Sequence, residues 1–429
     1  MLWLLIGYMF LFIHRPFEIW PILGDIHLER IYMAVVFLAW IVYGDKRWLR
    51  NQHHYAYFCF AFTVLVSWLM SNWMEQGQIV VENWFKVIFF YFLFITVVHE
   101  EDQLKKFCLA FLGVMAIYML HSLKEFVGGR HTYRMGIVRL IGVDSSLGDP
   151  NSYGASILFS LPFISLFWRT MPSRRMKLIL LGYIGLSMGS ILLTGSRSSL
   201  VCAMVWWAIV IMKTRYRFMA LAAAIFIAPL MFFALPESLQ NRFETIIDPS
   251  VGPKNAQVSG EGRIEGLLTG FRLLGEFPLT GIGPGAWRPA TGSEIESHNL
   301  YGQLMGELGG LGVITFVWIL IGFVVNIRWL RKQSQLIPEW KGEFLIQIGG
   351  TVGMGIFLML LNGNFGHNLF RHNWLWYGGF IIIARYVTEQ KIAQAHRAYA
   401  QEYVQEQSWQ IAYPQNQRNR FSRPIPSSI

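Results

Sequence analysis

The sequence predicts an all-α protein, a polytopic transmembrane helical bundle of about twelve spans with a large outer loop that contains an amphipathic helix. The chain of 429 residues is 54% hydrophobic. Only 14% of its residues are charged, whereas an ordinary soluble domain has about 25%. Its apolar runs do not alternate and are about 15–25 residues long, which favours membrane helices over barrel strands.

The apolar runs continue from the first residue to about position 388, and we interpret 1–388 as one transmembrane domain. The first run lacks a basic start and a small-residue cleavage site, so we expect a retained span and not a signal peptide. The three cysteines lie inside apolar runs, which indicates core residues and neither a disulfide framework nor a metal site. The expected spans are centred near residues 8, 36, 64, 91, 113, 160, 185, 205, 226, 314, 353 and 380.

Basic clusters alternate with the spans and predict the topology. Groups such as Arg174-Arg175 and Arg331-Lys332 fall on one side, which the positive-inside rule assigns to the cytoplasm together with both termini. Because these basic residues lie on the cytoplasmic side of a membrane protein, the net charge of +10 does not indicate nucleic-acid binding. The tail, 389–429, is rich in Gln, Arg and Pro and is expected to be partly disordered. Two long segments, about 123–150 and 236–298, lie outside.

Several arginines on the outer side contradict the charge rule and are therefore informative. Arg197, in LLTGSRSSLV, occupies a very short outer turn. Its small neighbours leave room for a large ligand, Ser196 and Ser198 can donate hydrogen bonds, and a guanidinium matches phosphate geometry. The alternative is an interfacial arginine that reaches toward water. Arg139, in the first outer segment, is a secondary candidate.

The second outer segment contains GRIEGLLTGFRLLGEFP, whose apolar residues recur at helical spacing. We expect an amphipathic helix lying on the outer surface, with Arg263 at its start. Arg263 either binds a ligand or is a solvated charge. Arg272 is interpreted as a charge on the polar face and kept as a secondary candidate.

His298 ends the second outer segment, directly before the tenth span. A neutral imidazole can accept a proton from a hydroxyl nucleophile, and Asn299 could orient it or bind a substrate oxygen. Competing residues are the outer histidines His131, His367 and His372 and the acids Glu294 and Glu296. His298 could also be an ordinary interfacial residue. Asp149 and Asn151 either bind substrate or shape the start of the sixth span.

Glycines give two structural predictions. Pairs at helical spacing, such as Gly185 with Gly189 and Gly302 with Gly306, indicate close helix packing. The GIGPG stretch at 281–285 has no preceding strand and no following Lys-Ser or Lys-Thr, so it predicts a turn and not a phosphate loop.

Two stretches together resemble the O-antigen ligase and polymerase superfamily: TGSRSSL at 194–200 and PLTGIGPGAW…SHNLYGQLMGELGGLG at 278–312. GDPNSYGASILFSLP at 148–162 is a third match. The resemblance implies a glycosyltransferase of the bacterial inner membrane with its site on the periplasmic side. It implies a donor glycan on undecaprenyl diphosphate and an acceptor hydroxyl on a glycolipid or glycan, with membrane lipids as further partners and no cofactor or metal.

The resemblance also implies residue roles. Arg197 and Arg263 would engage the diphosphate, and His298 would act on the acceptor. The loop lacks a tryptophan expected soon after Arg263, so Arg272 is the fallback. Chemistry agrees, because diphosphate is a good leaving group whose developing charge arginines can stabilise without a metal. A single base without a carboxylate nucleophile predicts inversion at the anomeric carbon.

Four functions remain open at this point. The first is a ligase with a lipid A–core-type acceptor, and the second is a polymerase that makes O-antigen or exopolysaccharide on a glycan acceptor. A protein O-oligosaccharyltransferase is disfavoured because the outer loops lack a large added domain. A transporter of lipid-linked sugars predicts inverted repeats and polar residues at mid-membrane, and the sequence has neither.

Overall fold

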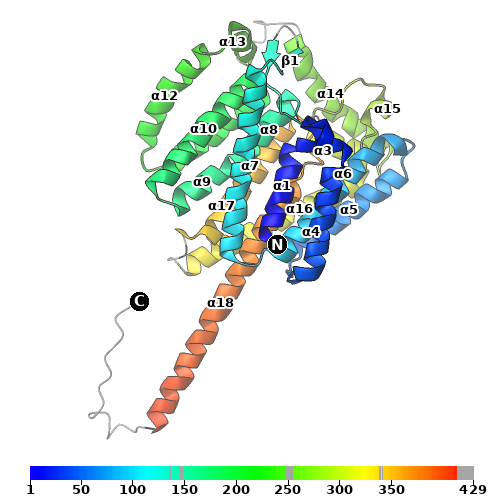
Figure 1. Cartoon of the computed structure of the whole chain (residues 1–429). Helices are drawn as coiled ribbons and strands as arrows, with labels where there is room; N and C mark the ends of the chain where they lie inside the picture. Colours follow the sequence, from blue (N-terminus) through cyan, green and yellow to red (C-terminus); the bar gives the residue numbers. More distant parts are fainter. Residues whose placement is uncertain (135–136, 145–147, 247–254, 338–339, 341, 413–429) are drawn as a thin grey trace.

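A computed structural model shows a bundle of helices with one small hairpin at its upper end (Figure 1). It describes the chain except residues 135–136, 145–147, 247–254, 338–339, 341 and 413–429. Because the described residues are mostly helical and include almost no strand, the expected all-α polytopic class is confirmed.

The elements follow one another as α1 (Leu2–His14), α2 (Pro16–Ile19), α3 (Pro21–Asp25), α4 (Leu28–Tyr43), α5 (His53–Leu69), α6 (Met74–Val97), α7 (Glu101–Val127), β1 (Thr132–Arg134), β2 (Ile137–Arg139), α8 (Pro150–Ser160), α9 (Pro162–Thr170), α10 (Arg174–Thr194), α11 (Arg197–Lys213), α12 (Arg217–Phe233), α13 (Glu237–Glu244), α14 (Asn255–Glu276), α15 (Trp287–Thr291), α16 (Leu300–Leu336), α17 (Phe344–Gly363) and α18 (Asn373–Ala412). The two strands pair antiparallel, with Thr132 opposite Arg139.

Each expected span centre falls on one of these helices or on α8–α9, which Pro162 divides. Six helices among the described residues are long and apolar enough to cross a membrane, and α12 is a shorter apolar helix. The protein is therefore a multi-pass membrane protein. The structure adds one feature that periodicity alone did not predict: α12 has no buried residue and stands at the edge of the bundle (Figure 1).

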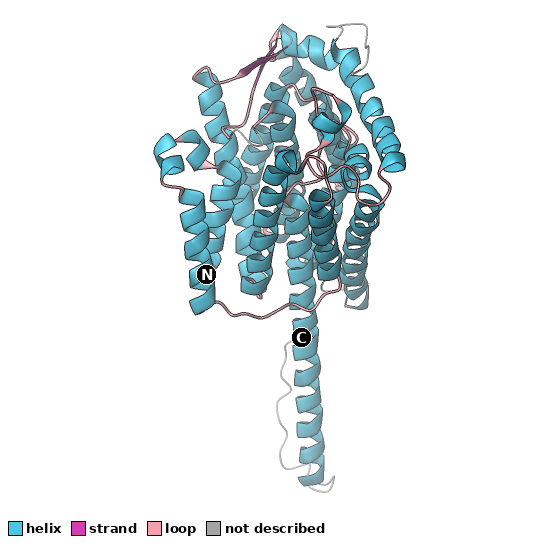
Figure 2. Ribbon diagram, turned by 90° about the vertical axis from the view of Figure 1, so that its right-hand side faces the viewer, coloured by secondary structure: helices cyan, strands magenta, loops and turns pink. Residues whose placement is uncertain are grey.

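The start of α1 and the protruding part of α18 lie on the same side of the bundle. The first helix begins at the lower end, and α18 leaves that end as a long single helix (Figures 1 and 2). This helix continues to Ala412, so it crosses the expected boundary at residue 388 without interruption. The tail beyond residue 412 lies outside the described residues.

The core is built largely from aromatic rings around the upper half of α18. Phe380 contacts Phe94, Phe107 and Phe163, and Trp376 packs against Phe90. All of these side chains are almost fully buried. The three cysteines are free and buried or partly buried, as the sequence predicted.

Helix α14 packs on α16 through glycines, and this corrects the expected orientation of α14. An added Cβ on Gly270 would lie 2.4 Å from the Cα of Gly302, so the two backbones touch. The apolar residues Ile264, Leu268 and Phe271 instead face outward, with more than half of each side chain exposed. In a bilayer the apolar residues can face lipid while small residues form the helix contact.

The other predicted glycine contact was wrong. Nothing lies within 4 Å of a Cβ added to Gly185 or Gly189. Gly306, in contrast, packs closely against Trp287. Spacing alone therefore did not distinguish glycines at helix contacts from glycines in open positions.

The GIGPG segment forms the predicted turn, with positive φ at its three glycines, and it is inserted into α16. Gly309 is non-helical there. The amides of Ile282 and Gly283 donate to the carbonyls of Gly306 and Glu307, at 2.9 and 3.0 Å. In return, the amides of residues 310 and 311 donate to the carbonyls of residues 278 and 279. The break in the helix is thus filled by backbone hydrogen bonds from another segment.

Candidate functional site

The expected site residues come together at the upper end of the bundle, around the turn between α10 and α11. Gly195 ends α10 in the left-handed conformation, with φ of 60°, and Ser196 caps α11. The Ser196 hydroxyl accepts from the Ser199 amide and lies 3.3 Å from the Ser198 hydroxyl. Both serines are buried, so their clearest contribution is to hold this turn in shape.

Two arginines stabilise the turn by binding the last carbonyls at the end of α10. Arg139 Nε donates to Thr194 O at 2.6 Å, and Arg242 Nε donates to Gly195 O at 2.7 Å. Arg139 also reaches Asn151 Oδ1 at 3.0 Å. Cations near a helix C-terminus are favourable, because they compensate the partial negative charge of its last carbonyls. The contacts of Arg139 are therefore structural. Arg242 is a neighbour that sequence reasoning missed.

Arg197 and Arg263 form a pair of like charges beside this turn. Arg197 Nη1 donates to Thr245 Oγ1 at 2.8 Å. Burial lowers the pKa of Arg263, and the nearby charge of Arg197 lowers it further. The Arg263 guanidinium lies 5.0 Å from the centre of the Phe365 ring. Two partly buried cations that repel each other make a site where an anion is stabilising.

His298 lies next to α14, one helical turn from Arg263. A Cβ added to Gly266 would lie 3.7 Å from the His298 amide nitrogen, and Gly266 follows Arg263 by one turn. The side-chain oxygen of Asn299 caps α16 by accepting from the amides of Tyr301 and Gly302. Asn299 thus fixes the backbone beside His298, and a direct contact with substrate stays a prediction.

A second histidine accompanies His298. The His298 and His367 rings are 5.8 Å apart, centre to centre. His367 is exposed, and a neutral imidazole at this position can also accept a hydrogen bond.

The loop between α17 and α18 connects these parts. It carries Phe365 against Arg263 and His367 against His298. It also carries Arg371, which is buried and donates to the Ser156 hydroxyl at 2.8 Å and the Ser152 carbonyl at 3.2 Å. Sequence reasoning missed Arg371, although an arginine in a short outer turn is the same signal that identified Arg197.

Asp149 and Asn151 have structural partners at the start of α8. Asp149 caps that helix through the amides of Asn151 and Ser152, and Asn151 accepts from Arg139. These contacts account for how both residues shape the sixth span.

The remaining candidates lie apart from the arginine pair or are paired elsewhere. Arg272 is exposed and forms an ion pair with Glu276 on the same helix, at 3.4 Å. Glu296 pairs with Arg288 at 2.9 Å, and burial raises its pKa while Arg288 lowers it. His372 is buried against Trp376. Among the described residues, no group of three or more His, Cys, Asp or Glu side chains could hold a metal ion.

Together, the fold and the site define a polytopic helical membrane protein with two neighbouring arginines and a histidine at one end of its bundle. A family model described as O-antigen ligase matches residues 182–317, which extend from α10 into α16 and include Arg197, Arg263 and His298. Over these residues the chain is similar to the O-antigen ligase family, which supports a superfamily member with a function of the ligase or polymerase type in general. No curated protein gives a significant match.

Proposed function

We propose that this protein transfers a glycan from undecaprenyl diphosphate to an acceptor hydroxyl at the outer face of the bacterial inner membrane. The observation that carries the proposal is the Arg197–Arg263 pair, with the His298 backbone beside Gly266, one turn of α14 from Arg263. A diphosphate supplies the negative charge that two neighbouring guanidinium groups favour. The acceptor we favour is a lipid A–core-type glycolipid, as in the ligase branch.

The reaction is a direct displacement at the anomeric carbon. The acceptor oxygen forms a bond to that carbon while the bond to the diphosphate oxygen breaks, and its electron pair leaves with the diphosphate. His298 accepts the proton of the acceptor hydroxyl. Arg197 and Arg263 stabilise the charge that develops on the leaving group, and no metal takes part. One displacement inverts the configuration.

The proposed orientation follows from the basic residues. The α9–α10, α11–α12 and α16–α17 connections lie at the end of the bundle opposite the site, and basic clusters flank them. By the positive-inside rule that end faces the cytoplasm, with both termini, and the site faces the periplasm.

The first test compares purified wild type with His298→Ala on undecaprenyl-diphosphate glycan and a panel of acceptors, in EDTA. We expect wild type to transfer and the variant to fall by about 10²- to 10⁴-fold while it still binds donor. Transfer is followed by mass spectrometry, and NMR of the product gives the anomeric configuration. The acceptor that works identifies the branch: a lipid A–core glycolipid, a glycan or a peptide.

Two further variants make this test specific. His367→Ala removes the neighbouring ring, and His131→Ala removes a histidine of the outer hairpin region. If His298→Ala retains wild-type turnover and His367→Ala does not, the base is His367. A requirement for divalent metal, or a product that retains the donor configuration, would contradict the proposed chemistry.

A further inference from the structure

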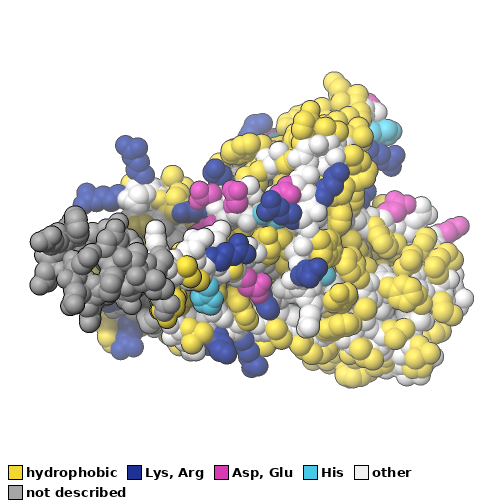
Figure 3. Space-filling model, turned by 90° about the horizontal axis from the view of Figure 1, so that it is seen from below, with side chains coloured by type: hydrophobic (Ala, Val, Ile, Leu, Met, Phe, Trp, Pro, Cys, Tyr) yellow, Lys and Arg dark blue, Asp and Glu magenta, His cyan; other side chains and the backbone are white. Residues whose placement is uncertain are grey.

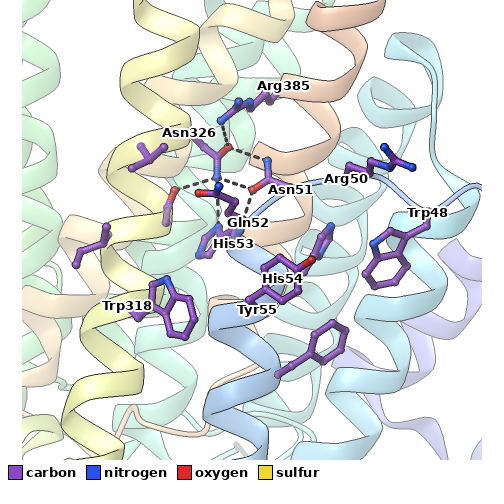
Figure 4. A pocket seen from close by; sticks show the side chains of 14 residues that line it. Trp48, Arg50, Asn51, Gln52, His53, His54, Tyr55, Trp318, Asn326 and Arg385 are labelled. Carbon is purple, nitrogen blue, oxygen red and sulfur yellow. Dashed lines mark hydrogen bonds between the residues drawn. The ribbon is translucent and has the colours of Figure 1, made fainter.

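A cavity lies at the end of the bundle opposite the candidate site. It has a volume of about 660 Å³ and is bounded by the start of α5, the middle of α16 and α18 (Figure 4). Small-molecule sites have volumes of about 300–1,000 Å³. None of the residues assigned to glycan transfer lines this cavity, so it is a separate site.

One part of the cavity wall is polar, and the charged side chains that line it are arginines. Asn51 donates to Asn326 Oδ1 at 2.9 Å, and Arg385 donates to the same oxygen at 3.2 Å. Arg385 is also held by Glu389 and lies over the Trp329 ring. Arg50 follows from the loop before α5. The described residues that line the cavity include these two arginines and no aspartate or glutamate.

The remaining wall is apolar and faces outward from the bundle. Trp318, Ile321 and Val325 lie along one side of α16, and each is 41–52% exposed. Tyr55 and Phe58 of α5 form the opposite side and are also exposed. Figure 4 shows the Asn326–Asn51–Arg385 group on one side of the cavity and Trp318 with Tyr55 on the other. The cavity is therefore amphipathic, and its apolar walls continue onto the surface that contacts lipid.

The surface around the cavity is basic, like the polar part of the cavity wall. Viewed from below, this end of the molecule carries lysine and arginine side chains beside broad hydrophobic surface (Figure 3). Basic pockets between membrane helices on this side attract the head groups of anionic lipids. The cavity thus combines hydrogen-bond donors for a phosphate with apolar walls for acyl chains. A phospholipid has these two parts side by side, at the boundary between its head group and its chains.

We propose that this cavity binds an anionic glycerophospholipid from the leaflet at the basic end of the bundle. Its phosphate contacts Arg385, Arg50 and the Asn51 amide, and an acyl chain lies between Trp318 and Phe58. The lipid joins α5 to α16 and α18. The proposal is independent of the glycan-transfer chemistry, because it concerns the opposite end of the molecule.

The test is native mass spectrometry of the detergent-purified chain with added phosphatidylglycerol, phosphatidylcholine or inorganic phosphate. We expect phosphatidylglycerol to bind at least about tenfold more tightly than phosphatidylcholine, and the Arg50→Gln/Arg385→Gln variant to lose that preference. Lys332→Gln is the matched control, since it removes a charge at the same end that does not line the cavity, and it should retain the preference.

A second variant separates lipid binding from effects on folding. Val325→Trp fills the apolar wall and keeps both arginines, so it should also abolish the preference while size-exclusion behaviour stays that of wild type. Equal binding of the two lipids by wild type, or an unchanged preference in both cavity variants, would overturn the proposal. Displacement of phosphatidylglycerol by equimolar inorganic phosphate would show a free-anion site and would overturn it too.

Discussion

At the residue scale, two arginines of one helix have opposite surroundings. Arg263 is partly buried, close to Arg197 and over the Phe365 ring. Arg272, further along α14, is exposed and pairs with Glu276. An exposed pair of this kind contributes little, whereas a charge-assisted hydrogen bond to a bound diphosphate contributes about 1.5–3 kcal/mol. The two residues therefore form a matched comparison.

We expect Arg263→Ala to lower glycan transfer by about 10- to 150-fold, because one charge-assisted contact with the diphosphate is lost. Arg263→Lys should recover part of the rate, since it keeps the charge and loses the planar fork. Steady-state transfer with purified donor measures both effects. Arg272→Ala is the control and should keep wild-type rates. The reverse result, with Arg272→Ala impaired and Arg263→Ala active, would move the diphosphate contact to Arg272.

At the element scale, the position of Arg263 depends on how closely α14 approaches α16. Gly270 and Gly302 allow the two backbones to touch, and Gly266 in the previous turn contacts the His298 backbone. Any side chain at this contact must push the helices apart. The distance from the arginine pair to His298 is thus set by residues that have no side chains and no chemistry of their own.

Gly270→Ala should lower both the melting temperature and the transfer rate, because its Cβ would lie 2.4 Å from the Gly302 Cα. Gly275→Ala is the matched control on the same helix, where nothing lies within 4 Å of an added Cβ. This control should be neutral or stabilising by up to about 1 kcal/mol, since alanine favours a helix. Thermal unfolding in detergent and transfer assays on both variants provide the measurement. Wild-type activity in Gly270→Ala would show that the close contact does not position the site.

At the scale of the whole molecule, the direction of the bundle in the membrane is a prediction from charge. After the three cysteines are replaced, we expect Glu294→Cys to react with a membrane-impermeant maleimide in right-side-out vesicles. Gln335→Cys, at the far end of α16, should react only after the vesicles are opened. Both positions are exposed, so access depends on sidedness. Labelling with the opposite pattern would place the candidate site in the cytoplasm.

Much of the fold could be predicted because hydrophobic length and basic clusters act over whole spans. Arg197, Arg263 and His298 are candidates from the sequence, since charged or titratable residues at the outer ends of spans are conspicuous, and their roles stay predictions. The outward face of α14 could not be predicted, because in a bilayer apolar side chains mark lipid contact as readily as a core. The insertion of GIGPG into α16 could not be predicted. It replaces hydrogen bonds within α16 by backbone hydrogen bonds from another segment, and backbone groups are the same in every residue except proline.

The replacement of helical hydrogen bonds near Gly309 has a consequence for how the protein is made. Gly309 lies about 14 Å along α16 from Leu300, so unmet carbonyls there would be within the membrane. Their partners, at 282 and 283, are synthesised before α16 and must return into the bundle after it inserts. Ser67 of α5 completes the join by donating to the carbonyls of Thr280 and Glu307. We therefore expect biogenesis to include a late closing step in which these carbonyls gain their partners.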